Sequence, residues 1–340
     1  MKRSTKKVKI LACALAVTLC MTLVSGCSSS PEATPAPASG SPAAETAQAF
    51  KSKIATNQPG QSWMTMGSTI SEYAKGTITL SVEPGSTYGN VLTTNSGETQ
   101  YGITAATTVS SGMSGTRFFS DKGKQENVRF VASLYRHYLR GFTVKPELKS
   151  WADLKGASVC FGPAGGESFD YDPLILSYFG LTKDDYEVKV MPFADGIEAM
   201  KNGQLDVILN CTPVPYAIFD DLAMSDDNAH LLQMDEATAK RLASEWPGFE
   251  YVEYDFDDVW NYNKPLYAPY QQITLIANAN VSDEEVYQMT KLIYERFEDL
   301  SNVVTNLKQV GEKNNLAYNP ANIPMHPGAE KFYKEVGALK

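Results

Sequence analysis

Histidine is scarce in this sequence, and the common motifs of catalysis and cofactor binding are missing. The 340 residues include three histidines, His137, His230 and His326, and no pair has the spacing of metal ligands. There is no Gly-x-Ser-x-Gly elbow, no His-Glu-x-x-His, no P-loop and no complete Gly-x-Gly-x-x-Gly. We therefore expect no catalytic residue, no metal and no cofactor. A secreted enzyme that acts on a small acid through paired carboxylates is the weaker alternative.

Cysteine is also sparse. Of five cysteines, Cys13, Cys20 and Cys27 lie in the first 27 residues, so only Cys160 and Cys211 remain for the folded part. In an oxidising compartment these two can form one disulfide or stay as buried thiols. Two free thiols are the favoured prediction, because a fold of this size does not need a disulfide for stability.

Positive charge is in the minority. The sequence has 30 Lys and Arg against 39 Asp and Glu, a formal net charge of −9. Five of the basic residues and none of the acidic ones lie in the first 27 residues, so 25 basic and 39 acidic residues follow them. An acidic surface without basic clusters argues against nucleic acid and anionic lipid as partners.

Long apolar runs are absent after residue 24, where nothing approaches the ~20 apolar residues that a membrane span needs. The one such run, 8–24, follows a basic start and ends in Val24-Ser25-Gly26-Cys27. This ending resembles the lipobox of bacterial lipoproteins, whose cysteine is lipidated and becomes the first mature residue. The resemblance implies a signal peptide over 1–27 and an extracytoplasmic protein held at the cell membrane by lipid on Cys27. An uncleaved anchor helix is the alternative.

Residues 28–49 are rich in Ser, Pro, Ala and Thr and show no apolar periodicity, which predicts a flexible tether. The rest of the chain, 50–340, is too long for one small core and suits two lobes. Strands and helices alternate along it. We expect strands at 51–56, 77–82, 101–104, 128–135, 157–161, 186–190, 205–210 and 272–277. We expect helices from about residue 62 onward, after Ser86, and at 151–156, 167–179, 196–202, 214–222 and 283–300. This order predicts an α/β fold with mainly parallel sheets covered by helices.

Three glycine-containing loops share one design, because each follows a predicted strand and opens a helix. They are Gly60-Gln61-Ser62, Gly85-Ser86-Thr87 and Gly165-Gly166-Glu167-Ser168. Backbone N–H groups at a helix start are free to bind an anion, and the helix dipole adds roughly half a positive charge there. In open α/β sheets such loops lie together at the carboxyl edge of the strands. We therefore expect the three loops to hold a small anion between two lobes.

Longer segments resemble a known family. NVRFVASLY (127–135), SWADLKGASVCFGPAGG (150–166), FGLTKDDYEVKVMPFADGIEAMKNGQLDVIL (179–209), VSDEEVYQMTKLIYE (281–295) and IPMHPGAEKFYKEVG (323–337) occur in the order typical of TAXI-type solute receptors of TRAP transporters. The resemblance runs from about residue 50 to the C-terminus. It implies a type II periplasmic-binding-protein-like fold of two lobes and a monomeric receptor. Such a receptor binds a small carboxylate and delivers it to an ion-gradient-driven permease. A receptor of similar fold that serves an ATP-driven importer is the alternative.

The family's first two glycine loops fall on 60–63 and 85–90, which adds Trp63 and Asn90 to the predicted ligand-binding residues. Its third loop falls on 165–169, where the sequence departs from the family pattern. In the family pattern this helix start is free to receive the acid group of the ligand, whereas here it carries Glu167. Either the helix dipole satisfies Glu167, or it meets an ammonium group and the ligand is zwitterionic.

Phe193 and Thr212 complete the predicted site, because each follows a strand of the second half at the edge where the cleft is expected. Phe193 and Trp63 can stack on a ring or cradle an ammonium group, although most aromatic residues belong to the core. Thr212 either bonds the ligand or caps the next helix. His137, beside Arg136 and Arg140, is interpreted as structural. The acidic residues Glu253, Asp255, Asp257 and Asp258 lack calcium-loop spacing and predict a solvated loop.

The same resemblance divides the chain into lobe 1, 50–141 plus 276–340, and lobe 2, 142–275. We expect the lobes to close about hinge strands near 139–145 and 272–277 and so to bury the solute.

Overall fold

The computed structural model describes residues 49–255 and 259–339. The predicted signal peptide, the lipidation site Cys27 and nearly all of the tether lie outside these residues, as do Asp257 and Asp258. Within the described part of the chain, no helix is long and apolar enough to cross a membrane.

Strands and helices alternate through most of the described chain. The strands are β1 Phe50–Ala55, β2 Ile78–Glu83, β3 Tyr101–Ala105, β4 Val128–Thr143, β5 Ser158–Cys160, β6 Glu187–Lys189, β7 Val207–Thr212, β8 His230–Leu231, β9 Phe249–Glu253 and β10 Tyr267–Asn278. The α-helices are α1 Ser62–Tyr73, α2 Thr87–Ser96, α3 Ala106–Ser114, α4 Ser168–Tyr178, α5 Phe193–Lys201, α6 Ala217–Ser225, α7 Glu236–Glu245, α8 Asp283–Glu295, α9 Phe297–Val303 and α10 Pro327–Glu335. Short 3-10 helices are η1 Arg117–Phe119, η2 Trp151–Leu154, η3 Thr305–Val310 and η4 Lys313–Ala317.

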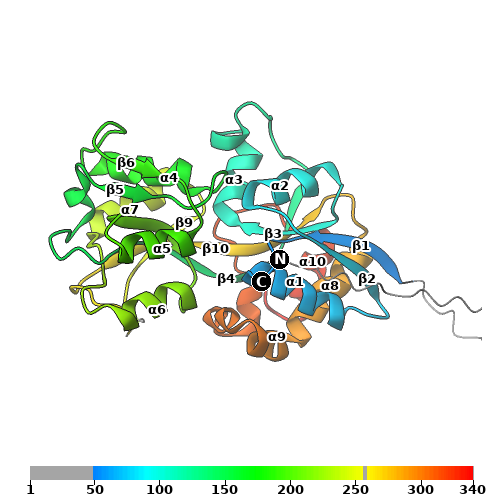
Figure 1. The fold of residues 1–340 in the computed structure, drawn as a ribbon. Coiled ribbons are helices and arrows are strands. Elements are labelled where there is room, and N and C mark those ends of the chain that lie inside the picture. Colours follow the sequence, from blue (N-terminus) through cyan, green and yellow to red (C-terminus); the bar gives the residue numbers. More distant parts are fainter. Residues whose placement is uncertain (1–48, 256–258, 340) are drawn as a thin grey trace, which may run out of the picture. The chain divides into compact units, whose positions relative to one another are not determined.

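The strands form one mixed sheet in the order β2-β1-β3-β10-β4-β7-β5-β6, with β8 beside β4 and β9 beside β10. β2, β1 and β3 are parallel to one another, and so are β7, β5 and β6. The antiparallel strands β10 and β4 run between these two groups (Figure 1). The predicted α/β class is confirmed. The two parallel groups belong to one sheet because β4, with 16 residues, is long enough to pair with β10 along one part and β7 along another.

The hydrophobic core changes at the middle of β4 and β10. One cluster of buried side chains contains residues from Tyr138 to Tyr270. The buried members of the other two clusters lie before residue 136 or after residue 272. On β10 the side chains alternate between these last two clusters, because Ile273 and Leu275 enter one and Ile276 enters the other. The sheet thus carries separate cores on its two faces.

Side-chain caps mark the starts of α2, α7, α8 and α10. The Ser86 hydroxyl accepts a hydrogen bond from the Gly89 N–H at 3.2 Å and caps α2, as predicted. Ser282 caps α8 in the same way through the Glu285 N–H. The helix expected over 283–300 is divided at Arg296 into α8 and α9. Helices α3, α7 and α10 are absent from the prediction, although Asp235 caps α7 and Pro327 opens α10.

One acidic side chain of α4 is buried without a partner. Asp172 is fully buried, and neither carboxyl oxygen forms a hydrogen bond with any described residue. Burial raises the pKa of Asp172 well above its usual range, and the nearby charge of Glu167 raises it further. An acid with a raised folded-state pKa stabilises the fold fully below its unfolded pKa of about 3.9, and that contribution is lost as the pH rises toward the folded value.

We therefore predict that Asp172→Asn stabilises the fold, relative to the wild type, by an amount that increases as the pH rises. Relative to the wild type, the free energy of unfolding of the variant should increase between pH 4 and pH 8, by at most about 1.4 kcal/mol per pH unit for one proton. Urea denaturation at several pH values measures this difference. Asp184→Asn, at an exposed position, controls for the loss of one carboxylate. A difference between Asp172→Asn and wild type that does not change with pH would contradict the prediction.

Candidate functional site

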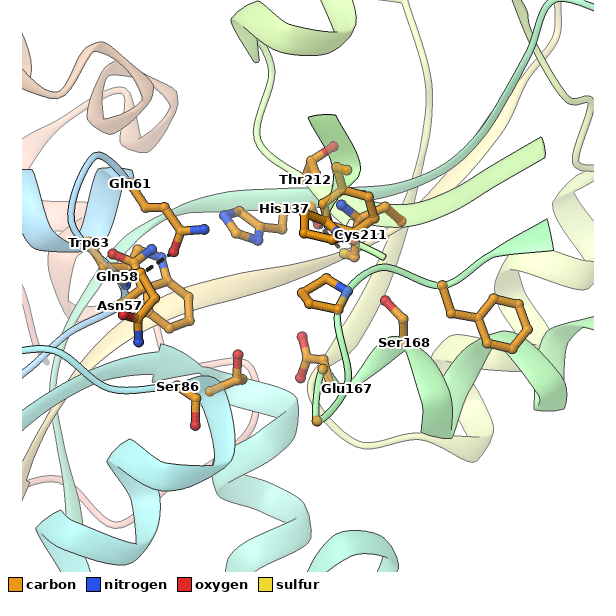
Figure 2. A pocket seen from close by; sticks show the side chains of 18 of the residues that line it. Asn57, Gln58, Gln61, Trp63, Ser86, His137, Glu167, Ser168, Cys211 and Thr212 are labelled. Atoms are coloured by element: carbon orange, nitrogen blue, oxygen red, sulfur yellow. Dashed lines mark hydrogen bonds between the residues drawn. The ribbon is translucent and has the colours of Figure 1, made fainter. Parts of the chain in front are cut away.

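A cavity of about 550 Å³ is lined by loops from both parallel strand groups (Figure 2). Its lining residues are Asn57, Gln58, Gln61, Ser62, Trp63, Gly85, Ser86, Thr87, His137, Phe161, Pro163, Ala164, Gly165, Gly166, Glu167, Ser168, Tyr171, Pro192, Phe193, Ala194, Asn210, Cys211, Thr212, Pro213, Tyr216 and Ile218. The three glycine-containing loops thus meet at one place. They do so because each follows the carboxyl end of a strand in the same sheet.

The structure brings all but two of the predicted ligand-binding residues to this cavity. Gly60 and Asn90 do not line it. Asn90 is buried, and its amide donates to the carbonyls of Thr56 at 2.6 Å and Ile103 at 2.7 Å. Its side-chain oxygen accepts the Ser86 N–H at 3.2 Å. Asn90 therefore fixes the loop that carries Ser86 from behind, whereas Gly60 supplies a turn with φ +86° before α1.

Five helices begin at the cavity wall. The first residues of α1, α2, α4 and α5, which are Ser62, Thr87, Ser168 and Phe193, line it, as does Tyr216, the N-cap of α6. No described group accepts a hydrogen bond from the backbone N–H of Ser62 or Thr87. Free N–H groups and helix dipoles give this wall a positive potential. The lining contains no Lys or Arg, so neutral donors supply that potential.

Hydroxyl groups at the wall are oriented by the protein. Arg140 lies behind the cavity, is buried, and donates to the Thr212 hydroxyl oxygen at 2.9 Å and to the Pro213 carbonyl at 3.1 Å. With Arg140 as donor, the Thr212 O–H can still donate to a bound group. Thr212 does not cap α6, whose N-cap is Tyr216. Ser168 is paired with the hydroxyl of Tyr171 at 3.0 Å.

Glu167 is the one acidic residue of the lining, and its side chain is bonded to residues of α3 and β10. Its carboxylate accepts hydrogen bonds from the Thr108 hydroxyl at 2.6 Å and from the Gln271 amide. Burial raises the pKa of Glu167, although the hydrogen bonds from Thr108 and Gln271 act in the opposite direction. Its side chain makes no hydrogen bond as the cap of α4. Glu167 therefore has side-chain donors that neither sequence interpretation foresaw.

His137 belongs to the site, although the sequence suggested a structural role. It lies on β4 between the labelled groups of Figure 2, and it lines the cavity. Its Nε2 is buried and has no hydrogen-bond partner among the described residues. Burial, followed by the charge of Arg140, lowers the pKa of His137 to about 3. The imidazole is therefore neutral near pH 7 and adds no positive charge to the wall.

Other lining residues were also missed. Asn57, Gln58, Asn210 and Tyr216 add amide and hydroxyl groups to the wall. Asn57 and Gln58 stand in the turn just after β1, and a polar turn after a strand was the available signal. Asn210 lies inside β7, where alternation alone does not say which face reaches a ligand.

The aromatic part of the wall comes from Trp63, Phe161, Tyr171 and Phe193. Trp63 stacks on His137 with ring centroids 6.3 Å apart and planes at 24°. Phe193 packs over Gly162, whose φ is +88°; a Cβ there would come within 2.4 Å of the ring. A glycine is therefore required beneath Phe193 for both backbone and steric reasons.

Cys160 and Cys211 are buried free thiols, as the sequence favoured. Cys211 lines the cavity, and its Sγ donates to the carbonyl of His137 at 3.2 Å. In the described ranges, no group of three His, Cys, Asp or Glu is placed to hold a metal ion.

Two parallel strand groups joined by two long strands, with a cavity lined from both, form the periplasmic-binding-protein-like α/β fold that the sequence predicts. The chain belongs to the NMT1-like family, which matches residues 54–337.

Solved structures to which the chain is similar include two proteins named SsuA. SsuA from Xanthomonas axonopodis pv. citri, bound to MOPS, is 13% identical with a TM-score of 0.47, over 85% of this chain and 92% of that chain. The periplasmic aliphatic sulphonate binding protein SsuA from Escherichia coli is 12% identical with a TM-score of 0.45, over 86% and 95%. An amino acid ABC transporter substrate-binding protein, AbpA from Streptococcus pneumoniae bound to L-arginine, is 15% identical with a TM-score of 0.42, over 76% and 95%.

Proposed function

We propose that this protein is an extracytoplasmic solute-binding protein that takes up a small carboxylate-bearing solute in the cavity of about 550 Å³. The observation that carries the proposal is the wall of that cavity, which contains five helix starts and neither Lys nor Arg. Helix N-termini bind carboxylate groups through free N–H groups and the dipole, without a cationic side chain. The amide, hydroxyl and aromatic groups of the remaining wall then select the rest of the solute.

Binding by closure of two lobes fits the distribution of the cores. The proposed lobes are 50–141 plus 276–340 and 142–275, with hinges near 139–145 and 272–277. The change of hydrophobic cluster between residues 135 and 138 on β4, and between 270 and 273 on β10, lies close to these boundaries. A bend in the two strands would therefore leave each core intact while the cavity closes.

The first test is a thermal-shift screen, begun with whatever small molecule mass spectrometry finds bound to the purified protein. A carboxylate should raise the melting temperature and be recovered unaltered. Thr212→Val should weaken its binding about 10- to 100-fold, because one hydrogen bond to a charged group contributes about 1.5–3 kcal/mol. Small-angle scattering should show a smaller radius of gyration with the same solute present.

Thr65→Val is the matched control, because Thr65 is exposed on α1 and outside the cavity. The melting temperature of each variant without solute shows whether it has folded. Chemical turnover of the solute would favour the enzyme alternative. Equal affinity in Thr212→Val and Thr65→Val would contradict a ligand at Thr212.

We further propose that the solute carries an ammonium group that meets Glu167. This carboxylate lines the cavity, and its two bonds to Thr108 and Gln271 leave lone pairs free. Glu167→Gln should weaken the binding of an amino acid far more than the binding of the matching acid without the amine. Calorimetric titration of both ligands measures this difference. If both ligands lose affinity equally, Glu167 supports the loop through Thr108 and Gln271 and does not contact the amine.

For delivery, we propose an ion-gradient-driven TRAP permease, on the strength of the ordered sequence segments between residues 127 and 337. The lipid on Cys27 would keep the receptor close to that permease. Uptake of the solute into proteoliposomes with the cognate permease should require an ion gradient and proceed without ATP. Uptake that depends on ATP would instead assign the protein to an ATP-driven importer.

A further inference from the structure

A second cavity lies beside the middle of β4 and β10. Its volume is about 220 Å³, well above the roughly 30 Å³ that one water molecule occupies. Its wall includes Arg136 and Gln272, with Ser133, Gln309, Asn315 and Tyr318 around them. Arg136 is the one charged residue of this wall.

Arg136 and Gln272 face the cavity as a cross-strand pair. They are directly opposite each other in the antiparallel pairing of β4 with β10. The next pair, His137 and Gln271, belongs to the other face: His137 lines the large cavity, and Gln271 bonds Glu167 there. Because side chains alternate along a strand, the two long strands supply one polar pair to each cavity.

Both members of the Arg136–Gln272 pair have unused donors. The Nε of Arg136 is buried and forms no hydrogen bond with the described residues. Gln272 is 5% exposed, and no described group bonds its side-chain amide. Buried polar groups in native proteins are nearly always paired, so the free Nε–H of Arg136 indicates a missing partner at this cavity wall. Arg136 also lies over the Tyr270 ring at 4.8 Å, which limits its freedom to turn away.

The remaining polar groups of the wall are already engaged. The Gln309 side-chain oxygen accepts a hydrogen bond from the backbone N–H of Arg136 at 3.1 Å, and the Gln309 side-chain amide donates to the Val214 carbonyl. The Tyr318 hydroxyl donates to Glu250, whose carboxylate does not itself line the cavity. Burial acts to lower the pKa of Arg136, whereas its hydrogen bond to the Tyr138 side chain and the nearby charge of Glu250 raise it, and the net shift is upward. What is left at the wall of the small cavity is the Nε–H of Arg136 and the carboxamide donor of Gln272. This donor set matches an oxyanion.

We propose that this second cavity is a binding site for a small oxyanion, such as a carboxylate or a sulfate, held by the guanidinium of Arg136 and the amide of Gln272. The site is separate from the solute cavity, because the two cavities share no lining residue, and it does not depend on the function proposed above.

The test follows the Nε–H signals of arginine in the NMR spectrum of the ¹⁵N-arginine-labelled protein. Arg136→Lys identifies the signal of Arg136. Sulfate and, separately, acetate are titrated at constant ionic strength, with chloride as the balancing ion. The Arg136 signal should move and reach saturation with at least one of the two ions. Gln272→Leu should weaken that binding about 10-fold, because it removes one hydrogen bond to a charged group. If the Arg136 signal shifts with acetate alone, the site binds carboxylates. If it shifts with sulfate alone, the site binds inorganic oxyanions.

Gln204→Leu, at an exposed position away from the cavity, is the matched control and should leave the titration unchanged. The Gln272→Leu variant tells this site from the large cavity, because Gln272 does not line the large cavity. An Arg136 signal that stays still with both ions would overturn the proposal and leave water as the occupant. Equal affinity in Gln272→Leu and wild type would overturn it as well.

Discussion

The antiparallel pairing of β4 with β10 is the constraint on which the rest of this structure depends. These strands join two groups of parallel strands that would otherwise be separate sheets. The hydrophobic core changes cluster where they cross from one group to the other. Their alternating side chains place His137 at the large cavity and Arg136 at the small one. A slip of one residue in their register would exchange these faces and disrupt both cavities at once.

The large cavity obtains its electrostatic character mainly from the backbone. Five helix starts contribute partial positive charge, while the one lining carboxylate, Glu167, is held by Thr108 and Gln271. The charged side chain of Arg140 lies behind the wall and donates a hydrogen bond to the Thr212 hydroxyl oxygen. Fixed dipoles of this kind favour a charged solute without offering it a side chain that must be desolvated first. The small cavity is built the opposite way, around the guanidinium of Arg136.

Sequence periodicity and turn chemistry predicted the α/β class, most strands and the three loops that meet at the large cavity. Asn90 and His137 show the limit of that reasoning. Both are polar residues near predicted loops or hinges. The Asn90 side-chain amide donates hydrogen bonds to backbone carbonyls, whereas the His137 side chain lines the cavity. The difference depends on which neighbours each side chain meets after folding. The same holds for Glu167, whose partners Thr108 and Gln271 are distant in sequence.

The sequence by itself determined the local elements, because caps, glycine turns and apolar periodicity act over a few residues. It also predicted that several helix starts would meet at one edge of the sheet, where they line the large cavity. Only the tertiary structure decided how the two parallel groups are joined, which residues turn toward each cavity and which buried donors lack a partner. These properties arise from pairing between β4 and β10, more than a hundred residues apart, and no local pattern encodes the register of that pairing.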